Sequence, residues 1–569
     1  MEEIKVSDYI ADFLANKKVT HVFEMVGGMI THMLDSINQR GLIKIVSCHH
    51  EQAAAFAAEG MGRTTGVPGV AMATSGPGAT NLITGIASCY FDSVPSVFIT
   101  GQVNTNEMKG NRKIRQLGFQ ETDIVRIAKP ITKASWQILS AKDVPKMMEK
   151  AFRLAVDGRP GPVLLDIPMN IQRATITVPT TKNNEMIKIS KDNFDKGQAK
   201  KLFTLLGKAQ RPLILVGGGL KSSRTVTEFR EFVRVTKVPV VYSLMAVDAL
   251  PYGHPQHIGL IGSYGNRWAN MALGQADFVL VLGSRLDVKQ TGADTKSFKA
   301  GRTFYHVDCD ASEINNRVTG CHSVVADLRT FFSVALEATE EYTFKERSGW
   351  LAKLNTLKKR YPDTAEQNVS GINPNALMHK ISRVSQQAST YVVDVGQHQM
   401  WAAQSMEVNK NQNFLTSGGL GSMGFSLPAA VGVAFASAKP VLLIAGDGCF
   451  QCNIQELETV AHHSLPIKMV VINNSCLGMV RQFQADYFDK NYQSTVLGYS
   501  TPNFEKIGNA YGIPSKTIDA NKQIKSALDW LWQDPKKPAL LQIMIDQSVN
   551  AYPKMAFGNP ITKMEPLKD

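Results

Sequence analysis

The sequence lacks several features that would place it in a broad class at once. Its seven cysteines are scattered over 569 residues and form no paired metal-binding or disulfide pattern. The N-terminal stretch MEEIKVSDYIADFLANKKV is charged and contains no apolar signal region, and no apolar run is long enough for a membrane span. These absences argue against a disulfide-rich secreted protein and a membrane protein. We expect a protein of the reducing cytoplasm.

A concentrated basic region is also missing. The formal net charge is +13, yet Lys and Arg form no long run, and no basic helix with interleaved aromatic residues is present. A basic surface that attracts anionic cofactors and substrates is a simpler explanation than nucleic-acid binding. We therefore expect small-molecule substrates, with neither nucleic acid nor membrane as a partner.

The residues that are present predict three α/β domains. Hydrophobic residues make up 44% of the chain, and apolar runs alternate with helical patterns from end to end. Polar segments at residues 175–198 and 353–374 divide the chain, which gives domains at about 1–175, 190–345 and 370–555. Each domain should contain a parallel sheet covered by helices. We expect strands at residues 43–47, 69–73, 96–100, 163–167, 213–216, 238–242, 278–282, 304–307, 441–445 and 467–472.

Polar residues follow two strands of the third domain at the point where each strand ends. The run 441–445 stops at Gly446-Asp447-Gly448, with a helical pattern from Cys449 to Leu457, and the run 467–472 stops at Asn473-Asn474. The carboxyl ends of parallel strands share one edge of a sheet, so Asp447 and Asn474 should lie side by side. Their oxygens suit Mg²⁺, and the helix that opens at the glycine turn favours a diphosphate. The alternative is an ordinary βαβ unit with no ligand.

A carboxylate in the first domain has two interpretations. Glu51 begins an alanine-rich helix directly after a buried strand, and the turn Thr74-Ser-Gly-Pro-Gly78 follows the next strand. Taken alone, a glutamate at a helix start is most simply a favourable contact with the helix dipole. A catalytic role requires a cofactor that needs an activating carboxylate.

Two further motifs match metal-binding and dinucleotide-binding patterns, but each lacks the additional residues that its pattern requires. Cys449-Phe-Gln-Cys452 is formally a CxxC, but no second pair accompanies it, so buried small residues explain it better than zinc or redox chemistry. Residues 419–424 spell GxGxxG, but no acidic residue follows about 20 positions later, as a dinucleotide fingerprint requires. We reject a dehydrogenase interpretation.

Together these motifs resemble those of the acetolactate synthase family of thiamine diphosphate (ThDP) enzymes. The Gly-Asp-Gly turn followed about 25 residues later by Asn-Asn is similar to the ThDP motif, and DVGQHQMWAAQ, GGLGSMGFSLPAA and LGMV also match. The resemblance covers nearly the whole chain. It implies the cofactors ThDP and Mg²⁺ in a site shared between two subunits, so that at least a homodimer, or a homotetramer, is expected.

The resemblance also implies roles for individual residues. Glu51 would activate the cofactor through its aminopyrimidine ring, Gln120 would lie beside the reacting carbon, and Met423 would bend ThDP. Asp447, Asn474 and the carbonyl of Cys476 would hold the metal. Further cofactor contacts are expected from Gly28, Gln397, His398, Gly421, Gly446, Gly448, Leu477, Gly478 and Met479.

The middle domain is similar to that of the FAD-binding acetolactate synthases. The strand and glycine-rich turn RPLILVGGGL, the stretch LGSRLD and the stretch HVDCDASEI carry this similarity. It implies an FAD site, with a structural or inherited flavin, formed by Arg159, Gly217, Gly218, Leu244, Met245, Gly283, Arg285, Asp308 and Asp327. A domain that holds ADP or no ligand is the alternative.

The sequence departs from the family where the acceptor substrate is recognised. The family tryptophan after LGMVxQ is Phe483 here, its Met-His pair is Ser263-Tyr264, and its Asp-Arg pair is Val288-Lys289. An arginine suited to a carboxylate is thus replaced by a lysine. The loop between Gln102 and Gln120 is longer than in the family and carries Arg112, Lys113 and Arg115. Neutral drift and a solvated basic loop would explain these changes equally well.

We interpret the chain as a ThDP-dependent carboligase. It would decarboxylate pyruvate and transfer the two-carbon unit to a ketone, with Phe483, Lys289, Arg112 and Arg115 at the acceptor. The pattern resembles carboligases of polysaccharide pathways that act on a nucleotide-linked keto-deoxy sugar, as in yersiniose biosynthesis. The alternatives are an acetolactate synthase that joins two 2-keto acids, a pyruvate oxidase, and a catalytically silent homologue.

Overall fold

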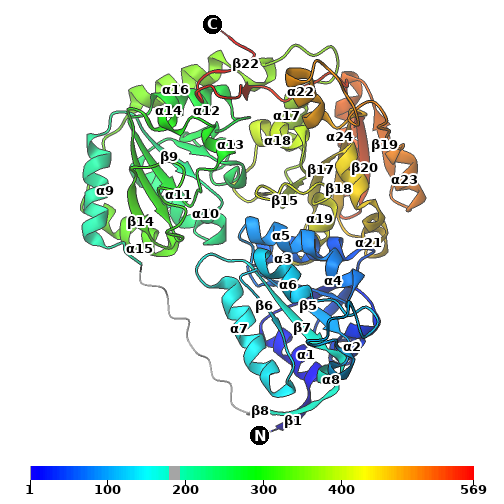
Figure 1. The fold of residues 1–569 in the computed structure, drawn as a ribbon. Helices are drawn as coiled ribbons and strands as arrows, with labels where there is room; N and C mark the ends of the chain where they lie inside the picture. Colours follow the sequence, from blue (N-terminus) through cyan, green and yellow to red (C-terminus); the bar gives the residue numbers. More distant parts are fainter. Residues whose placement is uncertain (1, 179–191, 569) are drawn as a thin grey trace.

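The computed structural model describes residues 2–178 and 192–568, which fold into three α/β domains, each built on a six-stranded parallel sheet. Figure 1 shows the first domain in blue and cyan, the second in green, and the third in yellow to red. The prediction of three parallel-sheet domains is confirmed. Within the described residues, no helix combines the length and apolar character that a membrane crossing requires.

The first domain has the strand order β3-β2-β4-β5-β7-β6. Its strands are β2 (His21–Met25), β3 (Lys44–Ser47), β4 (Gly69–Ala73), β5 (Ser96–Gln102), β6 (Ala134–Gln137) and β7 (Pro162–Pro168). The helices are α1 (Val6–Asn16), α2 (Thr31–Arg40), α3 (Glu51–Thr65), α4 (Pro77–Asn81), α5 (Ile83–Phe91), α6 (Ile124–Ala128), α7 (Val144–Val156) and α8 (Met169–Arg173). A small antiparallel pair joins β1 (Glu2–Lys5) to β8 (Thr175–Val178). The segment expected to be a linker therefore begins with a strand, and its residues 179–191 lie outside the described residues.

The second domain has the strand order β11-β10-β9-β12-β13-β14. Its strands are β9 (Pro212–Val216), β10 (Val240–Tyr242), β11 (His257–Leu260), β12 (Phe278–Leu282), β13 (Thr303–Asp308) and β14 (His322–Val325). The helices are α9 (Lys196–Lys208), α10 (Gly219–Ser222), α11 (Val226–Thr236), α12 (Arg267–Gln275), α13 (Val288–Thr291), α14 (Thr295–Lys299), α15 (Leu328–Thr339) and α16 (Ser348–Arg360).

The third domain has the strand order β16-β15-β17-β18-β20-β19. Its strands are β15 (Thr390–Val393), β16 (Asn413–Thr416), β17 (Val441–Gly446), β18 (Ile467–Asn473), β19 (Ser515–Ile518) and β20 (Ala539–Met544). The helices are α17 (Pro374–Val384), α18 (Gln397–Ser405), α19 (Ser426–Ser437), α20 (Asp447–Cys452), α21 (Leu457–His462), α22 (Gly478–Tyr487), α23 (Phe504–Ala510) and α24 (Ile524–Leu531). A short pair of strands, β21 (Lys554–Met555) and β22 (Met564–Glu565), follows near the C-terminus.

All ten expected strands are present, to within a few residues at their ends. The sequence did not reveal β2, β6, β11, β14, β15, β16, β19 or β20, most of which are short or lie toward the edges of their sheets. The helix expected from Cys449 to Leu457 is wrong in its bounds. It begins at Asp447 as α20, ends at Cys452, and is followed by a 3₁₀ turn (Ile454–Glu456) before α21.

Helices α3 and α19 cross closely and join the first domain to the third. A Cβ added at Gly60 of α3 would lie 2.3 Å from the carbonyl oxygen of Ala429. A Cβ added at Gly432 of α19 would lie 1.9 Å from the carbonyl oxygen of Ala57. Each helix thus presents a glycine to the backbone of the other, and the alanines around the crossing are buried in one shared core.

Candidate active site at the edge of the third sheet

Asp447 lies at the carboxyl edge of the third sheet, as predicted. Strands β17 and β18 are neighbours, and Gly446 pairs with Ile472 in their register. Asp447 is 3% exposed, and its Oδ1 accepts a hydrogen bond of 2.9 Å from the Gly448 N–H. Its Oδ2 is buried and has no hydrogen-bond partner in the described part of the chain. Burial raises the pKa of Asp447 to about 6, although N–H groups of Gly448 and Cys476 oppose the shift. A cation at Oδ2 would offset the cost of this buried charge.

Asn474 follows the neighbouring strand β18 and contacts Gln397, a pairing that was not predicted. The Asn474 side-chain amide donates to Gln397 Oε1 at 3.2 Å, and its Oδ1 accepts from the Cys476 N–H at 3.4 Å. A Cβ added at Gly478 would lie 2.0 Å from Gln397 Oε1, so a side chain at the start of α22 would displace the Gln397 amide. These contacts place Gln397, Asn474, Cys476 and Gly478 next to one another at the sheet edge.

A second buried polar atom without a partner faces the glycine turn. A Cβ placed on Gly448 would lie 2.7 Å from a Leu477 methyl, 3.0 Å from the Tyr499 hydroxyl and 3.3 Å from the Met423 methyl. The Tyr499 hydroxyl is buried without a hydrogen-bond partner in the described residues, and burial raises its pKa. Tyr499 was not found from the sequence, because it lies in an irregular segment with no motif. The Tyr499 hydroxyl is thus an unused donor and Asp447 Oδ2 an unused acceptor, both near Gly448. This pair fits a metal-bound diphosphate.

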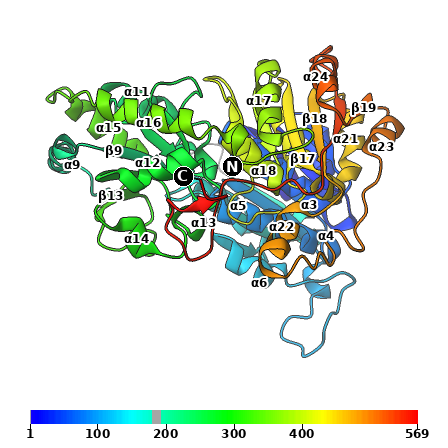
Figure 2. The same ribbon diagram turned by 90° about the horizontal axis from the view of Figure 1, so that it is seen from above.

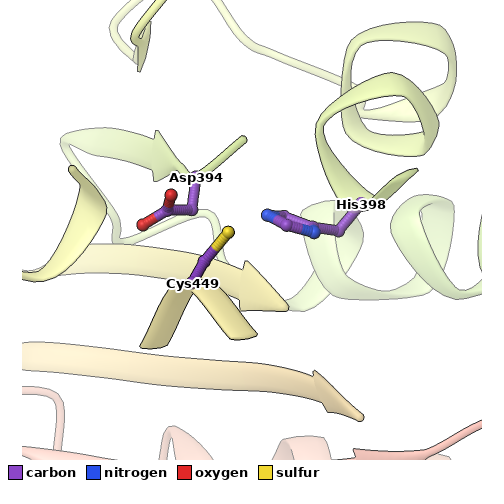
Figure 3. Close-up of side chains that lie close together, drawn as sticks. All are labelled: Asp394, His398 and Cys449. Atoms are coloured by element: carbon purple, nitrogen blue, oxygen red, sulfur yellow. The ribbon is translucent and has the colours of Figure 1, made fainter. Parts of the chain in front are cut away.

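His398, Asp394 and Cys449 point toward one another beneath this turn (Figure 3), and their candidate ligand atoms lie within 4.8 Å. These atoms already have protein partners. His398 Nε2 accepts from the Gly446 N–H at 3.2 Å, and the Cys449 thiol donates to the Val395 carbonyl at 2.8 Å. Burial lowers the pKa of His398 to about 4 and raises that of the Cys449 thiol. The cluster therefore orients backbone and is not a metal centre. Burial is confirmed for Cys449, but Cys452 is exposed.

Asp394 fixes the segment that carries Met423. Its Oδ1 accepts from the Gly424 N–H at 3.0 Å and its Oδ2 from the Ser426 N–H at 2.8 Å. Gly421 has a φ of 71°, which favours glycine. Met423 remains 39% exposed, so its side chain projects from an anchored backbone. The role of Asp394 was not predicted, although it begins the quoted motif DVGQHQMWAAQ.

The predicted residues of the first domain lie at the edge of their own sheet. Glu51 begins α3, is 7% exposed, and accepts a hydrogen bond of 2.9 Å from Asn81. Gln120 has a φ of 64° and packs on Gly76, where an added Cβ would approach it to 2.9 Å. Gly28 begins the 3₁₀ turn after β2. Within residues 2–178 and 192–568, no hydrogen bond joins Glu51 or Gln120 to Asp447, Asn474 or Gln397. That two subunits complete the site stays a prediction.

A cavity of about 350 Å³ lies at the edge of the second sheet. Of the residues expected there, it is lined by Arg159, Gly218, Leu244, Met245, Gly283, Arg285, Asp308 and Asp327. Gly217 is not among the lining residues, because it packs on the neighbouring turn, where an added Cβ would lie 2.3 Å from the Gly283 carbonyl oxygen. Lys289, expected at the acceptor, also lines this cavity.

The electrostatics of the cavity suit an anionic ligand. Basic side chains from the first two domains line it: Arg63, Arg159, Lys221, Arg224, Arg285, Lys289 and Arg329. Arg159 is held by Glu313 at 2.6 Å and Asp310 at 3.2 Å. Burial raises the pKa of Asp308 to about 6. The cavity is also lined by residues that no motif quoted for the flavin site contains: Arg63, Asp92, Met400 and Gly418.

The predicted acceptor residues lie on exposed elements. Phe483 on α22 is 53% exposed and contacts Tyr487 and Phe488, with ring centroids 4.9 and 5.6 Å away. Arg112 and Arg115 are exposed on the loop between β5 and α6, which Figure 2 shows in light blue extending away from the body of the chain. The Glu121 carboxylate braces this loop by accepting from the N–H groups of Lys109 and Leu117 at 2.7 and 2.8 Å.

Three family models match the chain, one for each domain. Residues 4–127 match the thiamine pyrophosphate enzyme N-terminal TPP binding domain, residues 199–334 the central domain, and residues 394–543 the C-terminal TPP binding domain. Thiamine pyrophosphate is another name for ThDP. The two outer matches contain the two halves of the predicted ThDP site.

Curated relatives cover almost the whole chain. The chain is 35% identical to the acetolactate synthase isozyme 2 large subunit of Escherichia coli over 562 residues, 98% of both chains. It is 35% identical to the acetolactate synthase large subunit of Lactococcus lactis over 97% of this chain and 94% of that protein. It is 34% identical to the chloroplastic acetolactate synthase 2 of Nicotiana tabacum over 98% of this chain and 84% of that protein. The chain therefore belongs to the acetolactate synthase-like family of thiamine diphosphate-dependent enzymes, and by class it is a carbon–carbon ligase.

Proposed function

We propose that this enzyme decarboxylates pyruvate and transfers the resulting two-carbon unit to the ketone of a nucleotide-linked keto-deoxy sugar. The observation that carries the chemistry is the pair of unused buried polar atoms at the third sheet, Asp447 Oδ2 and the Tyr499 hydroxyl, around Gly448. This arrangement supports a magnesium–diphosphate group. The family membership supports ThDP as the compound that carries it.

The residues of the third domain would bind and orient the cofactor. Asp447, Asn474 and the Cys476 carbonyl would hold Mg²⁺, and Tyr499 would donate a hydrogen bond to the diphosphate. Met423 projects from a backbone anchored by Asp394, so it can press on the cofactor without moving. When bound, ThDP supplies a carbon nucleophile and an electron sink.

Glu51 would exchange a proton with the aminopyrimidine ring of the cofactor. Its carboxylate is buried and accepts a hydrogen bond from Asn81 at Oε2, which fixes the side chain, and its Oε1 faces Gly78. A carboxylate held in this way can share a proton with a ring nitrogen of the pyrimidine. Because Glu51 and Asp447 lie at the edges of two different sheets, a homodimer or homotetramer in which subunits pair these edges is part of the proposal.

FAD is the proposed ligand of the central cavity. Eight of the nine expected residues line that cavity, and its seven basic side chains suit a diphosphate between two aromatic groups. Joining two carbonyl compounds involves no net electron transfer, so we assign the flavin a structural role.

The acceptor assignment rests on the exposed aromatic residues of α22 and on the basic loop. Phe483 is half exposed and lies on the helix that follows the metal-binding turn. The loop that carries Arg112, Lys113 and Arg115 is held by hydrogen bonds to the Glu121 carboxylate. These bonds fix the backbone positions of the three basic residues. This supports an acceptor that carries phosphate. Lys289 lies farther toward the flavin cavity than expected, which weakens its assignment to the acceptor.

The second candidate is acetolactate synthesis from two 2-keto acids, which the names of the relatives favour. The two functions are separated by product analysis. The enzyme is incubated with ThDP, Mg²⁺, FAD and pyruvate, with and without a nucleotide-linked 4-keto-deoxy sugar, and products are identified by mass spectrometry. A sugar product heavier by an acetyl unit supports the proposal. Acetolactate as the only product would favour acetolactate synthesis, the second candidate. Stoichiometric reduction of the flavin would indicate a pyruvate oxidase.

The basic loop has its own test. Replacing Arg112, Lys113 and Arg115 with alanine should raise the KM for the sugar nucleotide about tenfold and leave the KM for pyruvate unchanged, because only the acceptor carries phosphate. The matched control replaces Lys200, Lys201 and Lys208 on α9, which changes the net charge equally at a distant exposed helix. Equal KM values in the two variants would remove the loop from acceptor binding.

A further inference from the structure

A buried ion pair lies where the three domains meet. Asp92 follows α5, and Arg63 lies in the last turn of α3, both in the first domain. Asp92 Oδ2 contacts Arg63 Nη2 at 2.6 Å, and Arg63 Nη1 donates to the carbonyl of Thr416 in the third domain at 3.0 Å. Arg63 also pairs with Glu59 through the same Nη2.

Asp92 also holds the backbone of the third domain directly. Its Oδ1 accepts from the Gly419 N–H at 2.6 Å, and its Oδ2 accepts from the Gly418 N–H at 3.1 Å. One carboxylate therefore binds two successive N–H groups and an arginine. Hydrogen bonds to a carboxylate are stronger than those between neutral groups, so the position of the turn at Gly418-Gly419 depends on Asp92.

The same turn touches the second domain at the flavin-type cavity. A Cβ added at Gly418 would lie 2.2 Å from the sulfur of Met245, which leaves no room for a side chain between them. Arg63, Asp92, Met245, Gly418 and Gly419 all line that cavity. A ligand in the cavity would therefore contact the turn and the groups that hold it.

The turn leads directly to Met423. Asp92 anchors the chain at residues 418–419, and Asp394 anchors it again at Gly424 and Ser426. Met423 thus projects from a short bridge with one carboxylate at each end, one from the first domain and one from the third. Losing either anchor would let the bridge shift.

We propose that Asp92 is a positioning residue that couples the central cavity to the ThDP site through the bridge 418–426. A dinucleotide in the cavity restricts Met245 and the Gly418-Gly419 turn, and the turn in turn fixes Met423. When FAD has already ordered the bridge, ThDP loses less conformational entropy on binding and therefore binds more tightly. Because coupling between two binding sites is reciprocal, ThDP raises the affinity for FAD by the same factor. The inference rests on the proposed function only for the identity of the two ligands, FAD and ThDP.

The test is a set of four binding constants for each protein. The Kd of ThDP with saturating Mg²⁺ is measured by calorimetry with and without FAD, and the Kd of FAD by flavin fluorescence with and without ThDP. We expect each ligand to tighten the other about tenfold in the wild-type protein. Asp92→Asn, whose amide nitrogen cannot accept from Gly418 or Arg63, should reduce that factor to about one.

Glu59→Gln is the matched control. It alters the other carboxylate on the same arginine nitrogen but leaves the bonds from Asp92 to Gly418 and Gly419 intact, so the coupling factor should stay near the wild-type value. Met245→Ala acts from the cavity side. It should lower the coupling and leave the Kd of ThDP without FAD unchanged, and it keeps the inference testable if Asp92→Asn fails to fold.

The outcomes separate the inference from the proposed function. Wild-type protein that binds both ligands independently would overturn the coupling and leave the carboligase proposal standing. Unchanged coupling in Asp92→Asn or in Met245→Ala would overturn the role of the bridge. Wild-type protein that binds ThDP but not FAD would overturn both the flavin assignment and the coupling.

Discussion

The edge of the third sheet and the edge of the second sheet both carry proposed ligand sites after glycine turns, but they are built differently. At the third sheet, Asp447, Asn474 and Gly448 come from two neighbouring strand ends of one domain. At the second sheet, the cavity is lined by all three domains, with Asp92 from the first, Met245 from the second and Gly418 from the third. One site is local to a sheet, and the other exists only when the domains are assembled.

This difference has a physical consequence for each site. The local site keeps its geometry as long as strands β17 and β18 stay paired. The composite cavity depends on interactions across domain boundaries, such as the Arg63–Thr416 hydrogen bond. Substitutions should therefore affect the site at the third sheet only when they change a side chain that binds there. The cavity at the second sheet should also respond to substitutions that change how the domains pack.

The largest effect should come from Asp447→Ala at the local site. Removing the buried carboxylate removes a proposed metal ligand, so we expect no detectable binding of ThDP with Mg²⁺ and a loss of turnover of more than about 10³-fold. Calorimetry and pyruvate-dependent CO₂ release measure the two quantities. The Kd of FAD in the absence of ThDP should stay within about twofold, and a large change there would show that the two regions are not built separately.

Glu51→Gln should affect turnover without affecting either binding region. The amide keeps the size of the side chain but cannot share a proton with the cofactor, so we expect turnover to fall about 10²- to 10⁴-fold. The Kd values of ThDP and FAD should change less than threefold. Full turnover in this variant would remove Glu51 from the activation of the cofactor.

Arg159→Ala tests the composite cavity from the first domain. Arg159 lines the cavity and is oriented by Ser93, Asp310 and Glu313. We expect FAD to bind about tenfold more weakly, because a preorganised cation is lost, while ThDP without FAD binds as in the wild type. Flavin fluorescence titration measures the change. Lys196→Ala, on the exposed start of α9, serves as the control for loss of a positive charge.

The domain junction should also show a pH dependence of stability. Burial raises the pKa of Glu59 from its ordinary value of 4.5 to about 7, although Arg63 opposes the shift. Between pH 4.5 and about pH 7 the folded protein keeps the Glu59 proton that the unfolded chain releases. The stabilisation of the folded state by this proton is fully present below pH 4.5. It is lost as the pH rises to about 7.

Glu59→Gln lacks this titration. The free energy of unfolding of the wild type relative to the variant should therefore fall by on the order of 2 kcal/mol between pH 5 and pH 8. Urea denaturation at several pH values measures the difference. A difference that does not change with pH would mean that Glu59 is ionised throughout.

The sequence was sufficient to place Asp447 and Asn474 at neighbouring strand ends because the signal is contained in two short segments. Asp447 and Asn474 each follow an apolar run, and the rule that parallel strands share a carboxyl edge places them together. Tyr499 and Asp92 could not be found in this way. Tyr499 follows an irregular segment, and Asp92 acts on Gly418 and Gly419, more than 300 residues later in the chain. Contacts between domains leave no periodic pattern in either partner.

The strands that the sequence did not reveal are mostly short or lie toward the edges of their sheets. Long buried strands such as β17 and β18 stand out as apolar runs, whereas β15 and β16 have only four residues each. Helix α20 was misplaced because its start is set by Asp447 and its end by the break at Asn453, neither of which alters the apolar pattern.

The crossing of α3 and α19 determines how this protein can be recombined with its relatives. Gly60 faces the carbonyl of Ala429, and Gly432 faces the carbonyl of Ala57, so neither helix can accept a side chain at the crossing. A chimera that takes the first domain from one parent and the third from another inherits the two halves of this contact from different ancestors. A single methyl group on either glycine would keep the helices apart. Gene-shuffling libraries should therefore yield soluble protein chiefly when both helices carry glycine at these positions, whatever their overall identity.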